Sequence, residues 1–344
     1  MTLNTSLQGT ATYIRELQTP SGALPWFEGG IVDPWDHVEA AMGLSVAGEV
    51  DGARRAFEWL AHQQREDGGW YAAYQENSAA DRSRTETNFV AYVATGIWHL
   101  YLADGKRSDL VAFWPMVERA IDYVLNQQAP EGEIYWAVDS VKGVSRDALV
   151  TGCSSIYKSI QCALNMANVL GLARPRWQAG QRMLGEAILH KPSRFDRTWE
   201  SKQRYSMDWF YPILGGLVQG DAAKARLLEK WDTFVEPNLG CRCVSDQPWV
   251  TVAETCELIM ACVAADMRVQ AITLFDSIQQ FQLADGRWWT GYVFSDQVYW
   301  PDEHPSWTAA AVLLAADTLY QITPAHALFT SADAVAPPKT AARV

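Results

Sequence analysis

The stretch RRAFEWLAHQQREDGGWY, residues 54–71, joins an amphipathic helical run to a tight, aromatic turn. Apolar residues recur at helical spacing as far as the paired glutamines Gln63 and Gln64. The turn DGGW then redirects the chain and ends on Trp70, because glycines adopt backbone angles that other residues avoid. The segment therefore predicts a half-exposed helix, a sharp turn and the approach to a second helix.

Related turns recur along the chain. QREDGGW (64–70) has counterparts in QTPSGALPW (18–26), QAPEGEIYW (128–136) and QLADGRWW (282–289), with weaker echoes in HKPSRFDRTW (190–199) and VEPNLGCRC (235–243). Each turn follows one helix-period segment and precedes another. Such self-similarity predicts a fold built from repeated helix pairs.

The two helices of each predicted pair differ in character. The segments leading into the turns are amphipathic, and they cover residues 3–17, 51–64, 109–128, 174–190, 221–234 and 267–282. The segments that follow are apolar or small on every side, and they cover 35–48, 87–102, 152–171, 206–219, 251–265 and 306–321. A helix that is apolar all round is buried. The pattern predicts an all-α (α/α)6 toroid of six outer and six inner helices, spanning residues 1–330 as one domain. The Pro- and Ala-rich tail, 331–344, is predicted to be disordered.

Composition narrows the class of protein. The 344 residues carry a net charge of −12 without a basic stripe, which argues against a nucleic-acid surface. The N-terminus lacks a secretory signal and no apolar run is long enough for a transmembrane segment, so we expect a soluble, cytoplasmic protein. Sixteen tryptophans are several times the number in an average chain of this length, and they are expected to serve in packing or in binding. The expected partner is a small-molecule substrate in the central cavity.

The repeated turn also matches a known motif. In the first copy the matching positions are Arg54 or Arg55, Ala56, Trp59, Gln63, Gly68 and Trp70. The second copy has Arg119, Ala120, Tyr123, Gln127, Gly132 and Trp136, and the third has Gln282, Gly286 and Trp288. The pattern resembles the QW motif of the superfamily of squalene cyclases, terpene cyclases and protein-prenyltransferase β-subunits. The resemblance covers nearly the whole chain as architecture and implies the same toroidal fold.

Acidic residues gather where the inner helices are predicted to begin. Because these helices all run in the same direction, their N-termini meet at one mouth of the ring. We expect Asp36, Glu39, Asp208 and Glu254 to supply acid/base catalysis there. The structural alternative is helix capping: Asp33 before Pro34 is a typical N-cap, and Thr251 to Glu254 reads as a capping box.

Other polar and aromatic residues are predicted to bind substrate at the same mouth. They are Trp35, Glu86, Lys158, Tyr205, Trp209, Trp249, Trp300 and Trp307. Aromatic faces can stabilise a carbocation or stack on sugar rings. Lys158 lies within an apolar inner helix, where a lysine must be paired or face a wet cavity. It could bind an anionic group, extend to the mouth or pair with one of the acids.

The resemblance implies two chemistries that can be compared with this sequence. Polyene protonation uses a D-x-D-D string and diphosphate ionisation a D-D-x-x-D string, and the chain contains neither. Prenyltransferases hold zinc with an acid and a cysteine two residues apart plus a histidine on the next inner helix. Glu254, Cys256 and His304 resemble that set, with Cys241 and Cys243 nearby. Buried structural cysteines are the alternative, and no cofactor is otherwise expected.

Three functions follow from these observations. The first is an enzyme similar to terpene cyclases and prenyltransferases that acts on a small, partly hydrophobic, possibly isoprenoid substrate. The second is a carbohydrate-processing (α/α)6 enzyme, such as a glycosidase, lyase or epimerase, because paired acids beside tryptophans suit sugar chemistry. The third is a non-catalytic toroid that binds a ligand. The first is the main expectation of the sequence, and the other two are kept as alternatives.

Overall fold

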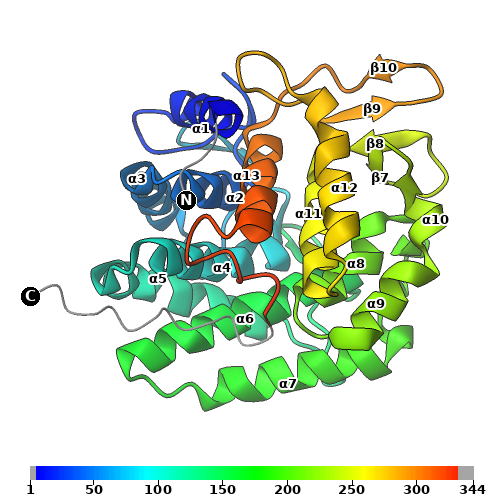
Figure 1. Cartoon of the computed structure of the whole chain (residues 1–344). Coiled ribbons are helices and arrows are strands. Elements are labelled where there is room, and N and C mark those ends of the chain that lie inside the picture. The colour runs from blue at the N-terminus through cyan, green and yellow to red at the C-terminus, as the bar shows by residue number, and fades with distance from the viewer. Residues whose placement is uncertain (1–4, 332–344) are drawn as a thin grey trace, which may run out of the picture.

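Twelve long helices alternate between an inner and an outer ring in the computed structural model, which describes residues 5–331 (Figure 1). The inner helices are α2 (Pro34–Val46), α4 (Thr87–Asp104), α6 (Val150–Leu170), α8 (Ser206–Leu214), α11 (Val252–Ala264) and α13 (Ser306–Tyr320). The outer helices are α1 (Thr5–Leu17), α3 (Val50–Gln63), α5 (Arg107–Leu125), α7 (Pro175–His190), α9 (Gly220–Glu229) and α12 (Arg268–Ile278), with the short α10 (Trp231–Phe234) after α9. Each inner helix contacts the next, and α13 contacts α2. The ring is therefore closed, and the predicted (α/α)6 toroid is confirmed.

Close approach between helices closes the ring. A Cβ atom added at Gly43 of α2 would lie 2.7 Å from the Cβ of Ala310 of α13. Only glycine fits that contact without a shift. Small residues on α2 and α13 thus allow the first and last inner helices to pack directly against each other.

The predicted motif residues work as a device that joins neighbouring repeats. The Gln64 side-chain amide donates to the carbonyl oxygens of Gly68 (2.9 Å) and Met116 (3.0 Å), and Arg119 of the next outer helix donates to the Gln64 side-chain oxygen. Two other repeats share the arrangement, through Gln18 with Gly22 and Gly52, and through Gln128 with Gly132 and Gly180. The second glutamine of each pair makes these bonds, so the assignment to Gln63 and Gln127 is corrected by one residue.

The glycine of this turn is required by the same contact. Gly68 has a φ of +94°, and a Cβ atom there would lie 2.4 Å from the carbonyl oxygen of Arg119. Trp70 is 1% exposed and its indole NH donates to the carbonyl oxygen of Leu60. The stretch that predicts the fold therefore serves packing between repeats, as expected.

Short strands lie only in the links from outer to inner helices. They form a two-stranded sheet of β1 (Ala73–Gln75) and β2 (Ser78–Asp81), a three-stranded sheet of β3 (Arg84–Glu86), β4 (Ala137–Asp139) and β5 (Gly143–Ser145), and a five-stranded sheet of β6 (Val235–Glu236), β7 (Gly240–Arg242), β8 (Trp249–Thr251), β9 (Gly291–Val293) and β10 (Val298–Tyr299). All of these links precede an inner helix, so the sheets surround the mouth of the ring.

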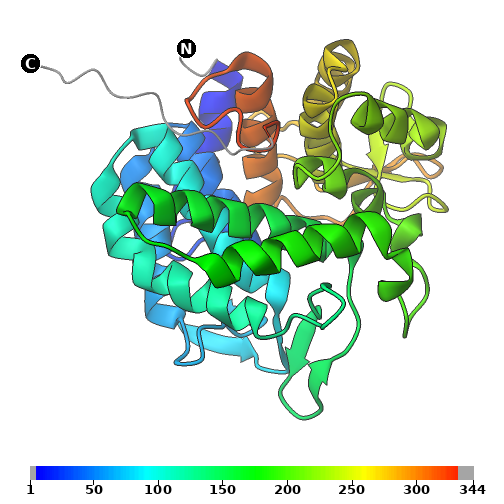
Figure 2. The ribbon, with the colours of Figure 1, turned by 90° about the horizontal axis from the view of Figure 1, so that it is seen from below.

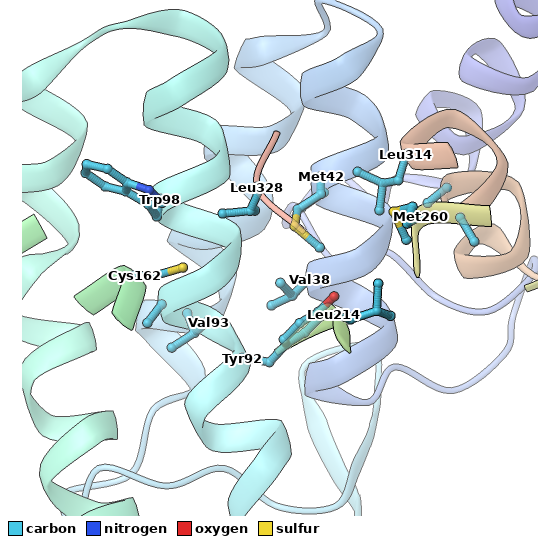
Figure 3. Close-up of a cluster of buried hydrophobic side chains, with 14 of the residues drawn as sticks. Val38, Met42, Tyr92, Val93, Trp98, Cys162, Leu214, Met260, Leu314 and Leu328 are labelled. Carbon is cyan, nitrogen blue, oxygen red and sulfur yellow. The ribbon is translucent and has the colours of Figure 1, made fainter. Parts of the chain in front are cut away.

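The opposite end of the ring is closed. The links there are short, and the segment that follows α13 crosses this end (Figure 1). Figure 2 shows β1 to β5 and the segment after α13 at opposite ends of the molecule. Apolar side chains fill the interior of the ring, among them Val38, Met42, Met260, Leu314 and Leu328 (Figure 3).

Two further expectations concern the ends and surface of the chain. Apart from Ser331, the predicted disordered tail lies outside the described residues. Among the helices that the structure describes, none combines the length and the apolar character needed to cross a membrane.

Candidate active site

The first two turns of α2 bring two carboxyl groups to the centre of the ring. Asp33 caps this helix: its carboxylate accepts from the backbone NH groups of Trp35 (2.9 Å) and Asp36 (3.0 Å) and from the Trp26 indole (2.6 Å). Asp36 and Glu39 follow it by one and two turns. The capping alternative therefore holds for Asp33, whereas Asp36 and Glu39 are free to face the cavity.

A second carboxyl pair begins α11. The capping box expected from Thr251 to Glu254 does not form, since the Thr251 side chain makes no capping bond. Glu254 lies near the Cys243 thiol and near Glu257, one turn further along. Glu257 accepts a hydrogen bond from the Tyr211 hydroxyl of α8. Sequence reasoning missed Glu257, although its spacing of three from Glu254 repeats the spacing of Asp36 and Glu39.

Aromatic side chains cover these acids. The Tyr92 hydroxyl of α4 donates to the Glu39 carboxylate at 2.6 Å. The Trp35 ring stacks on Tyr92 with centroids 4.0 Å apart and planes 9° from parallel, and it lies 6.3 Å from Tyr211. Tyrosines from α4 and α8 thus hold one acid each, below a partly exposed tryptophan. The arrangement is suited to a ring-shaped ligand above two carboxyl groups.

Burial raises the pKa of all three central acids, and repulsion from neighbouring carboxylates adds to the shifts of Asp36 and Glu257. Burial raises the pKa of Asp36 well above its usual value, and its hydrogen bond with Asp33 and the charges of Asp33, Glu39 and Glu257 add to this. Burial raises the pKa of Glu39 to about 7 and that of Glu257 well above normal, although the hydrogen bonds from Tyr92 and Tyr211 oppose the shifts. The three cannot all be ionised together at neutral pH. A protonated acid beside a carboxylate is what general acid/base catalysis needs.

Asp208 and Trp209 do not join this site. Asp208 lies in a separate pocket with Asp196 and Arg226, towards the outer helices, where burial raises its pKa to about 6. Trp209 is buried and stacks on Phe234 at 5.2 Å. The expectation that both face the cavity is corrected, because α8 turns Tyr211 and Leu214 inward instead.

The remaining predicted binding residues are divided between the mouth and the interior. Glu86 occupies the position before α4, and its side chain makes no capping hydrogen bond. Its carboxylate forms an ion pair with Arg84 at 2.7 Å. Burial raises the pKa of Glu86, although the Arg84 charge opposes this. Lys158 lines the interior beside Glu39 and Glu257 and donates to the carbonyl oxygen of Ser331 at 2.8 Å. Its predicted role as an anion site gains no support from that contact.

Aromatic residues line the rim of the mouth. Trp249, just before α11, packs edge-on against Trp300 with centroids 5.0 Å apart, and its indole NH donates to the Trp300 carbonyl oxygen. Trp307, in the first turn of α13, packs edge-on against Trp26 at 6.0 Å. Tyr205 precedes α8 and is partly exposed. These four predicted binding residues lie in the links that precede inner helices or in the first turn of an inner helix.

The predicted zinc set is not assembled. The His304 ring packs at a tilt against Trp289, with centroids 4.2 Å apart, and His304 lines a surface pocket with Tyr13 and Arg287, whereas Cys256 is fully buried. Within residues 5–331, no group of three or more His, Cys, Asp and Glu side chains could hold a metal ion. All six cysteines are free thiols. The geometry therefore gives zinc at Glu254, Cys256 and His304 no support.

Comparison with known proteins distinguishes the sequence-based functions. The chain is 47% identical over 324 residues to MMP endo-(1,4)-3-O-methyl-alpha-D-mannosidase of Mycolicibacterium hassiacum, covering 94% of this chain and 89% of that protein. It is 26% identical over 151 residues to lanosterol synthase of Pneumocystis carinii, covering 41% of this chain and 19% of the synthase. No family model matches the sequence.

Solved structures with the same fold include a glycosidase variant in complex with glucose. That structure superposes with a TM-score of 0.71 at 16% identity, covering 93% of this chain and 97% of the other. At this identity the likeness shows the fold alone. The partial match to lanosterol synthase agrees with the toroidal fold that the QW-type resemblance implies. The expected terpene-cyclase or prenyltransferase-like function is wrong, because the relative that matches nearly the whole chain is a mannosidase.

Proposed function

Because this chain belongs to the same family as the MMP endo-(1,4)-3-O-methyl-alpha-D-mannosidase of Mycolicibacterium hassiacum and is an enzyme, we propose that it hydrolyses internal α-1,4 bonds of a chain of 3-O-methylmannose. The identity over 94% of the chain is the observation that carries the proposal. Carbohydrate processing was the second of the functions that the sequence left open. The central acids and the aromatic rim support it in chemical terms.

Glycoside hydrolysis needs one carboxylic acid to protonate the leaving oxygen and one carboxylate to activate water or to attack the sugar. We assign the acid to Asp36, whose proton is retained by burial and by the bond with Asp33. We assign the carboxylate to Glu257, which accepts a hydrogen bond from the Tyr211 hydroxyl, and this bond opposes the rise in pKa that burial causes. A donated hydrogen bond stabilises the ionised form of a carboxyl group.

Glu39 is assigned a positioning role. It is 7% exposed and is held by Tyr92, which in turn stacks on Trp35. An ionised Glu257 raises the cost of ionising Asp36, and Glu39 adds to that cost. The pair therefore keeps the proton on Asp36 until a glycosidic oxygen approaches it.

Endo action requires the sugar chain to continue on both sides of the cleaved bond. The links that surround the mouth place Trp249 and Trp307 beside the starts of α11 and α13, where they can stack on further sugar rings. Trp300, 54% exposed on the hairpin of β9 and β10, extends this rim. We propose that these tryptophans bind the flanking residues of the polymer.

The test uses defined α-1,4-linked oligosaccharides of 3-O-methylmannose. The purified protein should release shorter oligosaccharides from the interior, detected by mass spectrometry. Asp36→Asn and Glu257→Gln should each lower kcat/KM at least a thousandfold. Asp208→Asn is the matched control, because Asp208 lies outside the cavity, and it should keep activity within about threefold. Folded wild-type protein that leaves every such oligosaccharide intact would show that the proposed substrate is wrong.

A further inference from the structure

A small hollow lies one helical turn deeper in the ring than the central carboxylates. Glu39, Ser155 and Glu257 each lie five residues after the first residue of their inner helix and line the upper part of the hollow, and Lys158, Leu214, Met260 and Phe329 line the deeper part. About 20 Å³ of the hollow is empty space that a group the size of a water molecule can occupy. That space accepts one water molecule or one methyl group and nothing larger.

Helix geometry sets the depth of the hollow. Met260 follows Glu257 by three residues on an inner helix that runs away from the mouth, so it lies roughly 4.5 Å deeper at 1.5 Å per residue. Leu214 ends α8, and Phe329 belongs to the segment that crosses the closed end. Figure 3 shows Leu214 beside Tyr92 and Val38 in the interior. A group that enters the hollow must therefore belong to the sugar held at the carboxylates.

One wall of the hollow carries hydrogen-bond donors. Ser155 is 5% exposed, and its hydroxyl has no hydrogen-bond partner among the residues that the structure describes. Buried hydroxyl groups are normally paired, so an orphan that faces a hollow indicates a missing ligand atom. Lys158 lies one turn further along the same helix, and its ammonium group donates to the carbonyl oxygen of Ser331.

The opposite wall is apolar. Leu214, Met260 and Phe329 present only hydrocarbon and thioether surface. An ether oxygen accepts hydrogen bonds and cannot donate them, and a methyl group gains free energy from apolar contact. A methoxy group therefore fits both walls, whereas a free sugar hydroxyl would leave the apolar wall without a partner.

We propose that this hollow binds the 3-O-methyl group of the mannose residue held at the carboxylates, with Ser155 donating to the ether oxygen and Leu214, Met260 and Phe329 enclosing the methyl group. The assignment rests on the proposed function and adds a specificity-determining site to it. It makes the methyl group a recognised feature of the substrate and Ser155 the residue that recognises it.

The test compares matched α-1,4-linked tetrasaccharides with and without 3-O-methyl groups. Wild-type protein should prefer the methylated substrate at least tenfold in kcat/KM. Ser155→Val removes the donor and fills the hollow, and it should lower kcat/KM for the methylated substrate at least tenfold while changing the unmethylated one less than threefold. Ser155→Ala removes only the donor and should lower the methylated value about threefold to tenfold.

Binding measurements keep the test independent of turnover. Calorimetric titration of Asp36→Asn with both tetrasaccharides should show the same preference, and the double variant with Ser155→Val should lose it. Leu214→Phe fills the hollow from the other wall and serves if Ser155→Val does not fold. An equal loss on both substrates would show that the hollow holds water or supports the acids, which would overturn the proposal.

Two further outcomes separate failure of the methyl site from failure of the proposed function. Wild-type protein that cleaves both tetrasaccharides equally, or a preference that survives both filled-hollow variants, overturns the methyl site alone. Wild-type protein that neither binds nor cleaves any oligomannoside overturns the proposed function as well.

Discussion

Replacing Glu39 by glutamine should make the protein more stable at alkaline pH. The side chain is buried inside the ring and burial raises its pKa from 4.5 to about 7. Glutamine has the same shape and can still accept the hydrogen bond from Tyr92. The variant therefore removes the charge and leaves the packing in place.

The magnitude follows from the difference in pKa between the folded and unfolded chain. The unfolded chain loses this proton near pH 4.5 and the folded protein near pH 7, so stability present below pH 4.5 is lost as the pH rises through 7. At about 1.4 kcal/mol per pKa unit, the ionised carboxylate costs roughly 3 kcal/mol at pH 8 and under about 1 kcal/mol at pH 5. Glu39→Gln should accordingly gain about 2 to 3 kcal/mol more at pH 8 than at pH 5.

Urea denaturation of both proteins at pH 5 and pH 8 measures this difference. Glu58→Gln is the matched control, because Glu58 is exposed on the outer helix α3, and it should show no such dependence on pH. If the stability difference between wild type and Glu39→Gln changes by less than about 0.5 kcal/mol between the two pH values, Glu39 is not held in a costly environment. The environment of the acid cluster would then not raise the pKa of Glu39, and the proposed catalysis would lose that support.

Three further predictions concern the site, the repeats and the core. Asp36→Asn should abolish hydrolysis and should stabilise the protein at neutral pH, because burial and neighbouring carboxylates raise the pKa of Asp36 and asparagine removes the cost of that shift. Large destabilisation with retained activity would show that Asp36 is structural. Gly68→Ala should destabilise the protein by at least about 2 kcal/mol, measured by denaturation, since the new Cβ would meet the carbonyl oxygen of Arg119 at a positive φ. His37 is buried, accepts from the Leu24 NH and has a pKa lowered by burial to about 4. Its contribution is present above pH 6.5 and falls by about 2 kcal/mol by pH 5, so His37→Asn should flatten the stability profile between pH 5 and 7.

The repeats could be predicted because their signals are local. Apolar periodicity distinguished buried from half-exposed helices, and every expected helix is present within one or a few residues of its predicted bounds except the segments at 206–219 and 221–234, which end earlier or are divided. The Gln, Gly and Trp of each turn contact the next repeat as expected from the motif. Neighbouring repeats are adjacent in sequence, so the residues that pack them together form short motifs that can be recognised.

The candidate site was predictable only in part. Glu39 lines the hollow inside the ring, Asp36 lies one turn before it on α2, and Trp249, Trp300 and Trp307 lie in or beside the links at the mouth. Asp208 and Trp209 point outward. Glu257 was not predicted from the sequence, which singled out Glu254 one turn earlier. Function was also misjudged, because the QW-type pattern describes how repeats pack and is shared by enzymes with unrelated chemistry.

The sequence by itself determined the number and order of the helices, the closed ring and the end at which the acids gather. Tertiary structure decided which side of each inner helix faces the cavity. A helix turns by 100° per residue, so a small change in its rotation replaces Asp208 by Tyr211 or Glu254 by Glu257. An inner helix that is apolar on every side has no polar face, so its sequence does not show which side points to the cavity. Only packing against five other inner helices sets it, and that packing places two tyrosines and three acids around one point.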